Sequence, residues 1–311
     1  PHAAECEVEP GLVNIVGPTY GCFNLPSDLE EIRRLIEGAG GRLNLVYPFN
    51  ANAPFETRLA DTPNLAKAQV NVLMYREFGH TLAESLGQPT LYAPMGMVET
   101  TEFVRELGEL LGTQDQAEAF IKREKQTTLQ AVWDLWRGPQ SDWFSTITVG
   151  FVASGTYVEG LTRYLGDELG MKVTMSHARP GADNSAIREQ IHTSPPSFLF
   201  GSINEKIYLS EAGAKQTSFM PAAFPGPVVR RAVGTPYMGY RGTVYVVQEI
   251  VNSLYNTLFN FLPVDTAYAR KGNKRGANGA NGAPPPQVSN APGKLPWTDD
   301  AKALLDTDIE K

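Results

Sequence analysis

The sequence of 311 residues is long enough for about two domains of ordinary size. Its 42% hydrophobic and 20% charged residues are typical of a globular protein, and its formal net charge of −7 argues against broad nucleic-acid binding, which needs a basic face. No apolar run is long enough to cross a bilayer, and the start of the sequence lacks the basic and then apolar pattern of a signal peptide. We therefore expect a cytoplasmic protein that is at most peripheral to a membrane.

Side chains that bind metals are sparse in this sequence. Cys6 and Cys22 are its two cysteines, and its four histidines are scattered without a motif. Two cysteines provide neither a disulfide framework nor a set of metal ligands, so a metal centre would need ligands from elsewhere. Cys22 follows an expected strand, where it is either a reactive thiol or, more often, a small buried hydrophobe.

The first part of the chain alternates short apolar runs with amphipathic segments. Such runs, bounded by Gly, Pro or polar residues, are typical of buried strands in a parallel sheet. The expected strands are residues 12–16, 43–47, 70–74 and 90–92. Helices are expected over 29–36, with Ser27 or Asp28 as the N-cap, over 59–68, 75–86 and 100–111, and as one long helix over 114–137.

The same order of strand, loop and helix starts again after this long helix. Strands are expected at residues 147–152, 171–175 and 198–200, and helices near 158–169, 184–191 and 205–213. The sequence thus predicts an α/β fold of two Rossmann-like domains with doubly wound parallel sheets, residues 1–139 with the connecting helix and residues 140–263. Ligands are expected at the carboxyl ends of the strands.

The composition changes after residue 263. Residues 264–296 are rich in Gly, Asn and Pro and have few bulky apolar side chains, which predicts a flexible linker. Residues 297–311 could form a short amphipathic C-terminal helix.

Residues 221–261 form the stretch around which the chain is expected to be arranged. Its first half is dense in Gly and Pro and contains Met238, Tyr240 and Arg241, and its second half, from residue 243, has the apolar spacing of a helix. Rings and a thioether can cover a flat π face while a guanidinium pairs with a carboxylate. The alternative is a well-packed turn with solvated arginines.

Common catalytic and nucleotide motifs do not occur in the sequence. It has no Walker loop, no Gly-x-Gly-x-x-Gly after the first strand and no Gly-x-Ser-x-Gly. Residues 17–21 occupy the place of a phosphate loop, but Pro18 lacks the N–H that such a loop uses. Arg76 and Glu77 follow the third strand, where a structural ion pair and a contact with substrate are both possible.

Several runs resemble a known family. VNIVGPTYGCFNLPSDLEEIRRLIEG, VNVLMYREFGHTLAESLGQP, FGSINEKIYLSEAG and AFPGPVVRRAVGTPYMGYRGTVYVVQEI are similar to the Z subunits of chlorophyllide a oxidoreductase, a nitrogenase-like enzyme of bacteriochlorophyll synthesis. The similarity covers most of residues 12–263 and resumes at 295–309. Related B-type subunits of protochlorophyllide reductase share single pieces of it and are the nearest alternative.

The resemblance implies a nitrogenase component 1-like fold, with the second and third of three Rossmann-like domains present here. It implies a heterotetramer with Y-type subunits, a 4Fe-4S cluster shared with the Y subunit, and an X-type iron–sulfur reductase that uses ATP. The complex would reduce the ring B double bond of chlorophyllide a. The cluster ligand of this subunit would lie upstream, so no metal-binding or cofactor-binding residue is expected in this segment.

The resemblance also gives the candidate site residues. Ser154 stands where the related protochlorophyllide reductase has a proton-donating aspartate. The pKa of a serine hydroxyl is too high for an effective general acid near neutral pH, so the proton is expected from another group, from the substrate or through water. The residues expected to line or support the substrate pocket are Tyr20, Tyr157, Met238, Tyr240 and Arg241.

Two hypotheses of other classes stay open at this stage. One is a non-catalytic nitrogenase-like scaffold that carries a cofactor. The other is a two-lobed binding protein of the periplasmic type, which the lack of a signal-peptide pattern disfavours.

Overall fold

The computed structural model describes residues 7–18, 24–48, 57–136, 144–224 and 235–261, and for residues 136 and 257–261 the backbone alone. The predicted boundary between residues 139 and 140, the predicted linker at 264–296 and the predicted helix at 297–311 lie outside these ranges, as do Cys6, Tyr20 and Cys22. Residues 1–262 form one compact unit.

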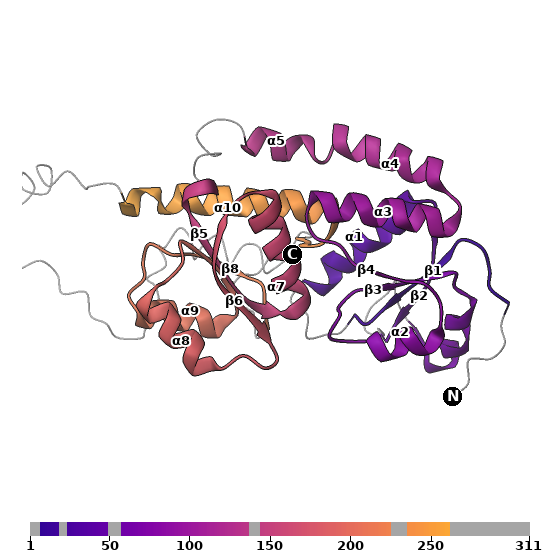
Figure 1. Ribbon diagram of the computed structural model, residues 1–311, viewed down its shortest axis with the longest axis horizontal. Helices are drawn as coiled ribbons and strands as arrows, with labels where there is room; N and C mark the ends of the chain where they lie inside the picture. Colours follow the sequence, from indigo (N-terminus) through magenta and orange to yellow (C-terminus); the bar gives the residue numbers. More distant parts are fainter. Residues whose placement is uncertain (1–6, 19–23, 49–56, 137–143, 225–234, 262–311) are drawn as a thin grey trace, which may run out of the picture. The chain divides into compact units, whose positions relative to one another are not determined.

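Two four-stranded parallel sheets form the centre of this unit (Figure 1). Sheet A has the strand order β2-β1-β3-β4, with β1 at Leu12–Val16, β2 at Arg42–Tyr47, β3 at Val70–Leu73 and β4 at Thr90–Tyr92. Sheet B has the order β6-β5-β7-β8, with β5 at Thr148–Ser154, β6 at Lys172–Arg179, β7 at Phe198–Gly201 and β8 at Ser218–Pro221. The two sheets share one doubly wound topology, which confirms the predicted fold class.

Helices connect successive strands, as parallel pairing requires. In the first half they are α1 (Leu25–Gly38), the 3-10 helix η1 (Leu59–Lys67), α2 (His80–Leu86), α3 (Met97–Leu111), α4 (Gln114–Gln126) and α5 (Gln130–Trp136). In the second half they are α7 (Gly155–Leu161), the π-helix η2 (Thr162–Glu168), α8 (Asn184–Thr193), α9 (Ile203–Glu211) and α10 (Gly239–Phe261). The strands β1, β3 and β7 are buried throughout, because helices cover the faces of their sheets.

The final helix contacts elements of both sheets. α10 packs against α1, α3, α5 and β8 (Figure 1), and Val246, Val247 and Ile250 are fully buried on its inner side. One apolar core cluster therefore includes residues from both sheets and from α10.

Three helix predictions were wrong in detail. The N-cap of α1 is Asn24, so Ser27 and Asp28 lie inside the helix. The segment predicted as one helix over 114–137 is broken into α4 and α5, because Leu129 N bonds to Glu124 O, five residues back, and the Thr127 hydroxyl bonds to a backbone carbonyl.

The third difference concerns residues 239–242, which the sequence assigned to the stretch rich in Gly and Pro that precedes the helix expected from residue 243. These residues form the first turn of α10, with Gly239 at a φ of 70°. A Cβ on Gly242 would lie 2.3 Å from the backbone carbon of Tyr237, so the close approach of the chain to its own helix requires a glycine here.

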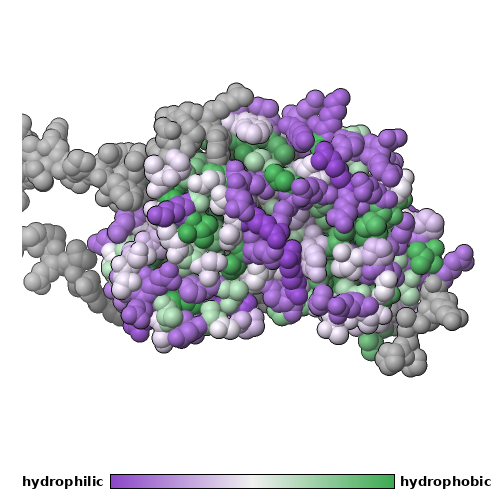
Figure 2. Space-filling model, viewed as in Figure 1, coloured by the Kyte–Doolittle hydropathy of each residue, from purple (hydrophilic) through white to green (hydrophobic). Residues whose placement is uncertain are grey.

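Hydrophilic residues cover most of the face seen in Figure 2, with hydrophobic residues in small separate groups. Among the described residues, no helix has both the length and the apolar character needed to span a membrane.

Candidate functional site

The carboxyl ends of β1, β3 and β5 bring together the polar groups on which the candidate site is built. Ligands of open α/β sheets bind at this edge. Two features are found there: a buried carboxylate, Asp28, and a set of carboxylates that link sheet A to sheet B.

Asp28 holds three segments that are distant in the sequence. Its side chain is fully buried in the first turn of α1. It accepts hydrogen bonds from the Tyr157 hydroxyl, from Tyr237 N at 2.6 Å and from Met238 N at 3.1 Å. We call these four residues the Asp28 junction. It joins α1 of the first half to α7 and to the start of α10.

Aromatic packing surrounds the junction. The ring of Tyr157 meets that of Tyr237 edge-on, with centroids 5.4 Å apart at 89°, and lies 6.2 Å from the ring of Tyr75. All three rings are buried. Such contacts fix the ring positions and keep water away from the carboxylate.

Burial raises the pKa of Asp28 to about 6, and the hydrogen bonds from Tyr157, Met238 and Tyr237 oppose this rise. The charged form of Asp28 is therefore less stable in the folded protein than in water, even with these hydrogen bonds. A carboxylate kept under such conditions at the carboxyl end of a parallel sheet is typical of a functional site.

The stability of the unit is expected to depend on pH through Asp28. Its pKa is about 6 in the folded protein against an ordinary value of 3.8, so the folded state holds the proton more tightly. The stabilisation is complete below about pH 4 and is lost as the pH rises through about 6. Between pH 5 and pH 7 the free energy of unfolding should fall by about 1–1.5 kcal/mol more in the wild type than in Asp28→Asn. Denaturant unfolding of both proteins at the two pH values measures this, and equal falls would contradict it.

Two carboxylates cap helices across the sheets. Glu77, which follows β3 of sheet A, accepts hydrogen bonds from the backbone N–H and the hydroxyl of Thr156 in the first turn of α7. Glu168, at the end of η2 beside sheet B, accepts hydrogen bonds from Met97 N at 2.8 Å and Val98 N at 3.2 Å in the first turn of α3. The N–H groups of a first helical turn have no partner within their own helix, so each half satisfies donors of the other.

Ion pairs add to this connection. Arg76 pairs with both carboxylate oxygens of Glu159 at 2.9 Å, and its guanidinium lies 4.3 Å from the ring centroid of Tyr92. Arg163 pairs with Glu99 and with Glu159. Arg76 and Glu77 thus serve contacts between the sheets, and the network disfavours a protein that opens as two hinged lobes.

Replacing Glu77 with Ala is expected to lower the free energy of unfolding by about 1–2 kcal/mol, because Thr156 N then lacks its acceptor. Glu84→Ala is the matched control, since Glu84 is 66% exposed and contacts His80 in its own helix. Its effect should stay within about 0.5 kcal/mol. Thermal and denaturant unfolding compare the two, and equal effects would show that the contact between the sheets adds nothing.

The structure brings some of the predicted site residues together. Tyr157 and Met238 meet at Asp28, and both side chains are buried. Ser154 ends β5 and caps α7, where its hydroxyl oxygen accepts a hydrogen bond from Tyr157 N at 3.4 Å. Ser154 and Tyr157 thus lie at the carboxyl end of β5, and Met238 is linked to Tyr157 through Asp28.

The other predicted residues lie apart from this group. Tyr240 is fully buried, with its hydroxyl 3.0 Å from that of Thr101. Arg241 is 56% exposed and lies 3.7 Å from Glu31, whose carboxylate also accepts from Arg241 N at 3.0 Å. Tyr20 lies outside the described residues. Substrate contact by any of the six residues stays a prediction.

Sequence reasoning missed the carboxylates that organise the site. Asp28 lies one turn before Ile32 on the apolar stripe of α1, and a charged residue at such a position is a signal that the sequence does contain. Glu77 was singled out as a charged residue after the third strand, whereas Glu168 gives no comparable signal, because its partners belong to another element. The residues missed in this way are Asp28, Thr156 and Glu168.

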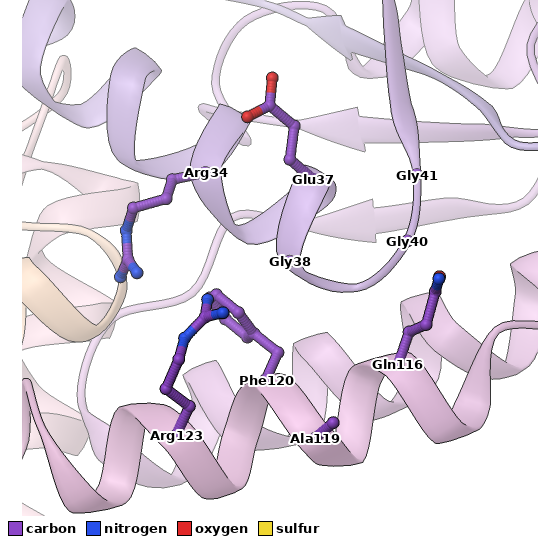
Figure 3. Close-up of a pocket in the computed structure, with 9 residues that line it drawn as sticks. All are labelled: Arg34, Glu37, Gly38, Gly40, Gly41, Gln116, Ala119, Phe120 and Arg123. Carbon is purple, nitrogen blue, oxygen red and sulfur yellow. The ribbon is translucent and has the colours of Figure 1, made fainter.

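A cavity of about 630 Å³ lies at the opposite end of sheet A, where α4 faces the turn between α1 and β2 (Figure 3). It is lined by Arg34, Glu37, Gly38, Gly40, Gly41, Gln116, Ala119, Phe120 and Arg123. Arg34 already pairs with Glu31 at 2.7 Å and with Glu124 at 2.9 Å, and Arg123 lies 3.6 Å from Glu124. The arginines that line the cavity are thus already paired with carboxylates. The cavity also lies away from the edge of the sheet at which ligands bind.

The comparison with known families decides the kind of protein. The profile described as "Nitrogenase component 1 type Oxidoreductase" matches residues 2–182 and 176–255. The chain belongs to this family.

Relatives within the nitrogenase component 1 type family include light-independent protochlorophyllide reductase B subunits. The subunit of Chloroflexus aggregans is 32% identical over 192 residues, which cover 58% of this chain and 34% of the relative. That of Gloeothece citriformis is 26% identical over 272 residues, which cover 78% of this chain and 51% of the relative. The chain thus spans about half or less of the length of these relatives.

The fold is also that of a solved family member. The structure "Nitrogenase Cp1 at pH 6.5" matches with a TM-score of 0.63 at 16% identity, covering 83% of this chain and 63% of that one. At this identity the likeness concerns the fold alone.

Proteins of the nitrogenase component 1 type are associated with metal clusters, which need several side chains as ligands. The described part of the chain contains no group of three or more His, Cys, Asp or Glu that could hold a metal ion. The described residues, which include neither cysteine of the sequence, therefore do not by themselves supply the ligands of an iron–sulfur cluster, which needs several thiolates or comparable ligands.

Proposed function

We propose that this chain is part of the Z subunit of a cytoplasmic chlorophyllide a oxidoreductase. In this role it forms one wall of the chamber in which the ring B double bond of chlorophyllide a is reduced by two electrons. The observation that carries the proposal is the family match over residues 2–255, together with relatives that are named as reductases of a closely related tetrapyrrole.

The proposal assigns electron delivery to partners. A Y-type subunit shares a 4Fe-4S cluster with the upstream part of this subunit, and an X-type reductase supplies electrons with hydrolysis of ATP. The present residues then have two tasks, to orient a flat apolar macrocycle and to exclude water from it.

The Asp28 junction suits the second task. Tyr157 and Met238 are buried, so we propose that they support the pocket wall from behind. The carboxyl end of β5, with Ser154, then borders the substrate. The links between the sheets keep this edge fixed while electrons arrive.

A second candidate is the B subunit of a light-independent protochlorophyllide reductase. The names and identities of the relatives favour it. Ser154 favours the Z subunit, because the B subunits use an aspartate at the place that the resemblance assigns to this serine.

Reconstitution separates the two candidates. The full-length protein is mixed with Y and X subunits, ATP, a reductant and either chlorophyllide a or protochlorophyllide, and the product is followed by absorbance. Conversion of chlorophyllide a is the expected result. A second assay replaces Y and X with the partner subunits of a protochlorophyllide reductase. Conversion of protochlorophyllide alone in that assay would assign the chain to the second candidate, and conversion of neither substrate in either assay would reject both.

Ser154→Ala is expected to keep most of the activity of the reconstituted complex. The serine hydroxyl is a poor acid at neutral pH, so the proton comes from another donor. Single-turnover rates of wild type and variant give the measurement. A loss beyond about a thousandfold, the scale of removing a direct proton donor, would show that Ser154 supplies the proton after all.

A further inference from the structure

Arg179 is the last residue of β6 and lies at the ligand-binding edge of sheet B. It is the register partner of Ser154, the last residue of the neighbouring strand β5. Side chains of register partners leave the same face of a sheet. The guanidinium of Arg179 therefore belongs to the edge that borders the substrate in the proposed function, on which this inference rests.

A buried carboxylate holds this guanidinium in place. Arg179 Nη2 donates to Glu205 Oε1 at 2.6 Å, and Glu205 is fully buried. The other oxygen, Glu205 Oε2, accepts from Ser202 N at 2.7 Å and from the Ser202 hydroxyl at 2.6 Å. These bonds fix the carboxylate, which in turn orients the arginine.

One donor of Arg179 is left without a partner. Its Nε is buried and has no hydrogen bond to any described residue. No other guanidinium nitrogen in the described ranges is in this state. A buried donor without an acceptor costs about 1–3 kcal/mol, and more when it belongs to a charged group. The Arg179 side chain as a whole is 23% exposed although its Nε is buried, so a carboxylate that approaches the guanidinium must shift the side chain to meet the Nε–H.

The other arginines between helices differ in this respect. Arg34 pairs through Nε, Nη1 and Nη2 with Glu31 and Glu124, Arg76 pairs through Nη1 with both oxygens of Glu159, and neither has a buried nitrogen without a partner. Arg179 combines a fixed position, partial exposure and an unused N–H.

We propose that Arg179 binds the free carboxylate of the tetrapyrrole substrate and so selects the free acid over its esters. A planar guanidinium pairs well with a carboxylate, and the Nε–H supplies a charge-assisted bond that the protein itself does not use. The apolar macrocycle then lies toward the Ser154 side of the edge, with its acid group anchored at the end of β6.

The test uses the full-length protein in complex with its partner subunit and two probes, chlorophyllide a and its methyl ester. Binding is followed by absorbance and fluorescence titration, without turnover. The wild type should prefer the acid by about tenfold, the size of one charge-assisted hydrogen bond. Arg179→Gln should reduce this preference to about twofold or less, and in the active complex it should raise KM for the acid and leave kcat unchanged.

Two further variants make the result decisive. Arg188→Gln is the matched control, because this arginine of α8 is exposed and pairs with Glu211, and it should keep the full preference. If Arg179→Gln unfolds because Glu205 is left charged and unpaired, the double variant Arg179→Gln/Glu205→Gln removes both charges and gives the answer.

An acid preference that survives in the Arg179 variant, or in the double variant, would overturn the inference. A preference that is absent in the wild type would overturn it as well, while tetrapyrrole binding would stand. Failure of the wild-type complex to bind either probe would reject the proposed function, and this inference with it.

Discussion

Replacing Asp28 with Ala is expected to lower the free energy of unfolding at pH 5 by about 3 kcal/mol, because three buried donors lose their acceptor. These donors are the hydroxyl of Tyr157 and the N–H groups of Tyr237 and Met238. The measurement is best made at pH 5, below the pKa of about 6, where the carboxyl is largely protonated and the penalty for burying its charge is small. Denaturant unfolding, with the slope m compared between variants, gives the value.

Asp28→Asn separates loss of hydrogen bonds from loss of charge. Its amide oxygen can accept from the two backbone N–H groups and its NH₂ can donate to the Tyr157 hydroxyl. The expected loss at pH 5 is therefore below about 1 kcal/mol. Should the Ala variant be as stable as the Asn variant, the junction would not hold the three segments together.

Seven of the eight strands in the described residues could be predicted from the sequence, because each of the seven carries its own signal, whereas β8 at Ser218–Pro221 was not predicted. The run at residues 198–200 is apolar throughout and that at residues 12–16 is apolar apart from Asn14, and both lie between Gly, Pro or polar residues, which is the pattern of a strand buried on both faces. Because these runs alternate with amphipathic helices, the sequence predicts an α/β fold with doubly wound parallel sheets. The resemblance implies the same fold class.

The Asp28 junction could not be predicted in the same way. Asp28 was interpreted as a helix cap because capping is the local use of an aspartate at a helix start. Its real partners, Tyr157 and Tyr237, lie 129 and 209 residues away. No local sequence pattern predicts a contact between residues so far apart. The sequence therefore predicted a capping role for Asp28, whereas in the structure it binds Tyr157 and Tyr237.

Residues 221–261 also show how far local sequence patterns can predict a site. Tyr240 and Met238 have the composition of a binding loop, yet both side chains are buried. Their spacing suits helix packing equally well, and the contact of α10 with α1 and α3 decides between the two. Arg179, at the end of β6, was not among the predicted site residues, because its position depends on Glu205, a residue of α9.

Replacing Gly17 with Ala is expected to lower the free energy of unfolding by about 3–5 kcal/mol. Gly17 follows β1 with a φ of 85°, and a Cβ there would lie 2.1 Å from the backbone oxygen of Phe78. The obstacle is main chain, so neither side can move aside without shifting the turn after β3. That turn also carries Glu77, so the bond of Glu77 to Thr156 should weaken in the same variant.

Gly11→Ala isolates the contribution of the contact. Gly11 has nearly the same backbone angle, a φ of 80°, but nothing lies within 4 Å of its would-be Cβ. It should lose about 1–2 kcal/mol, the strain of a left-handed backbone alone. The difference between the two variants in thermal and denaturant unfolding then measures how tightly the ends of β1 and β3 are packed. Equal losses would mean that the ends of β1 and β3 are loosely packed against each other.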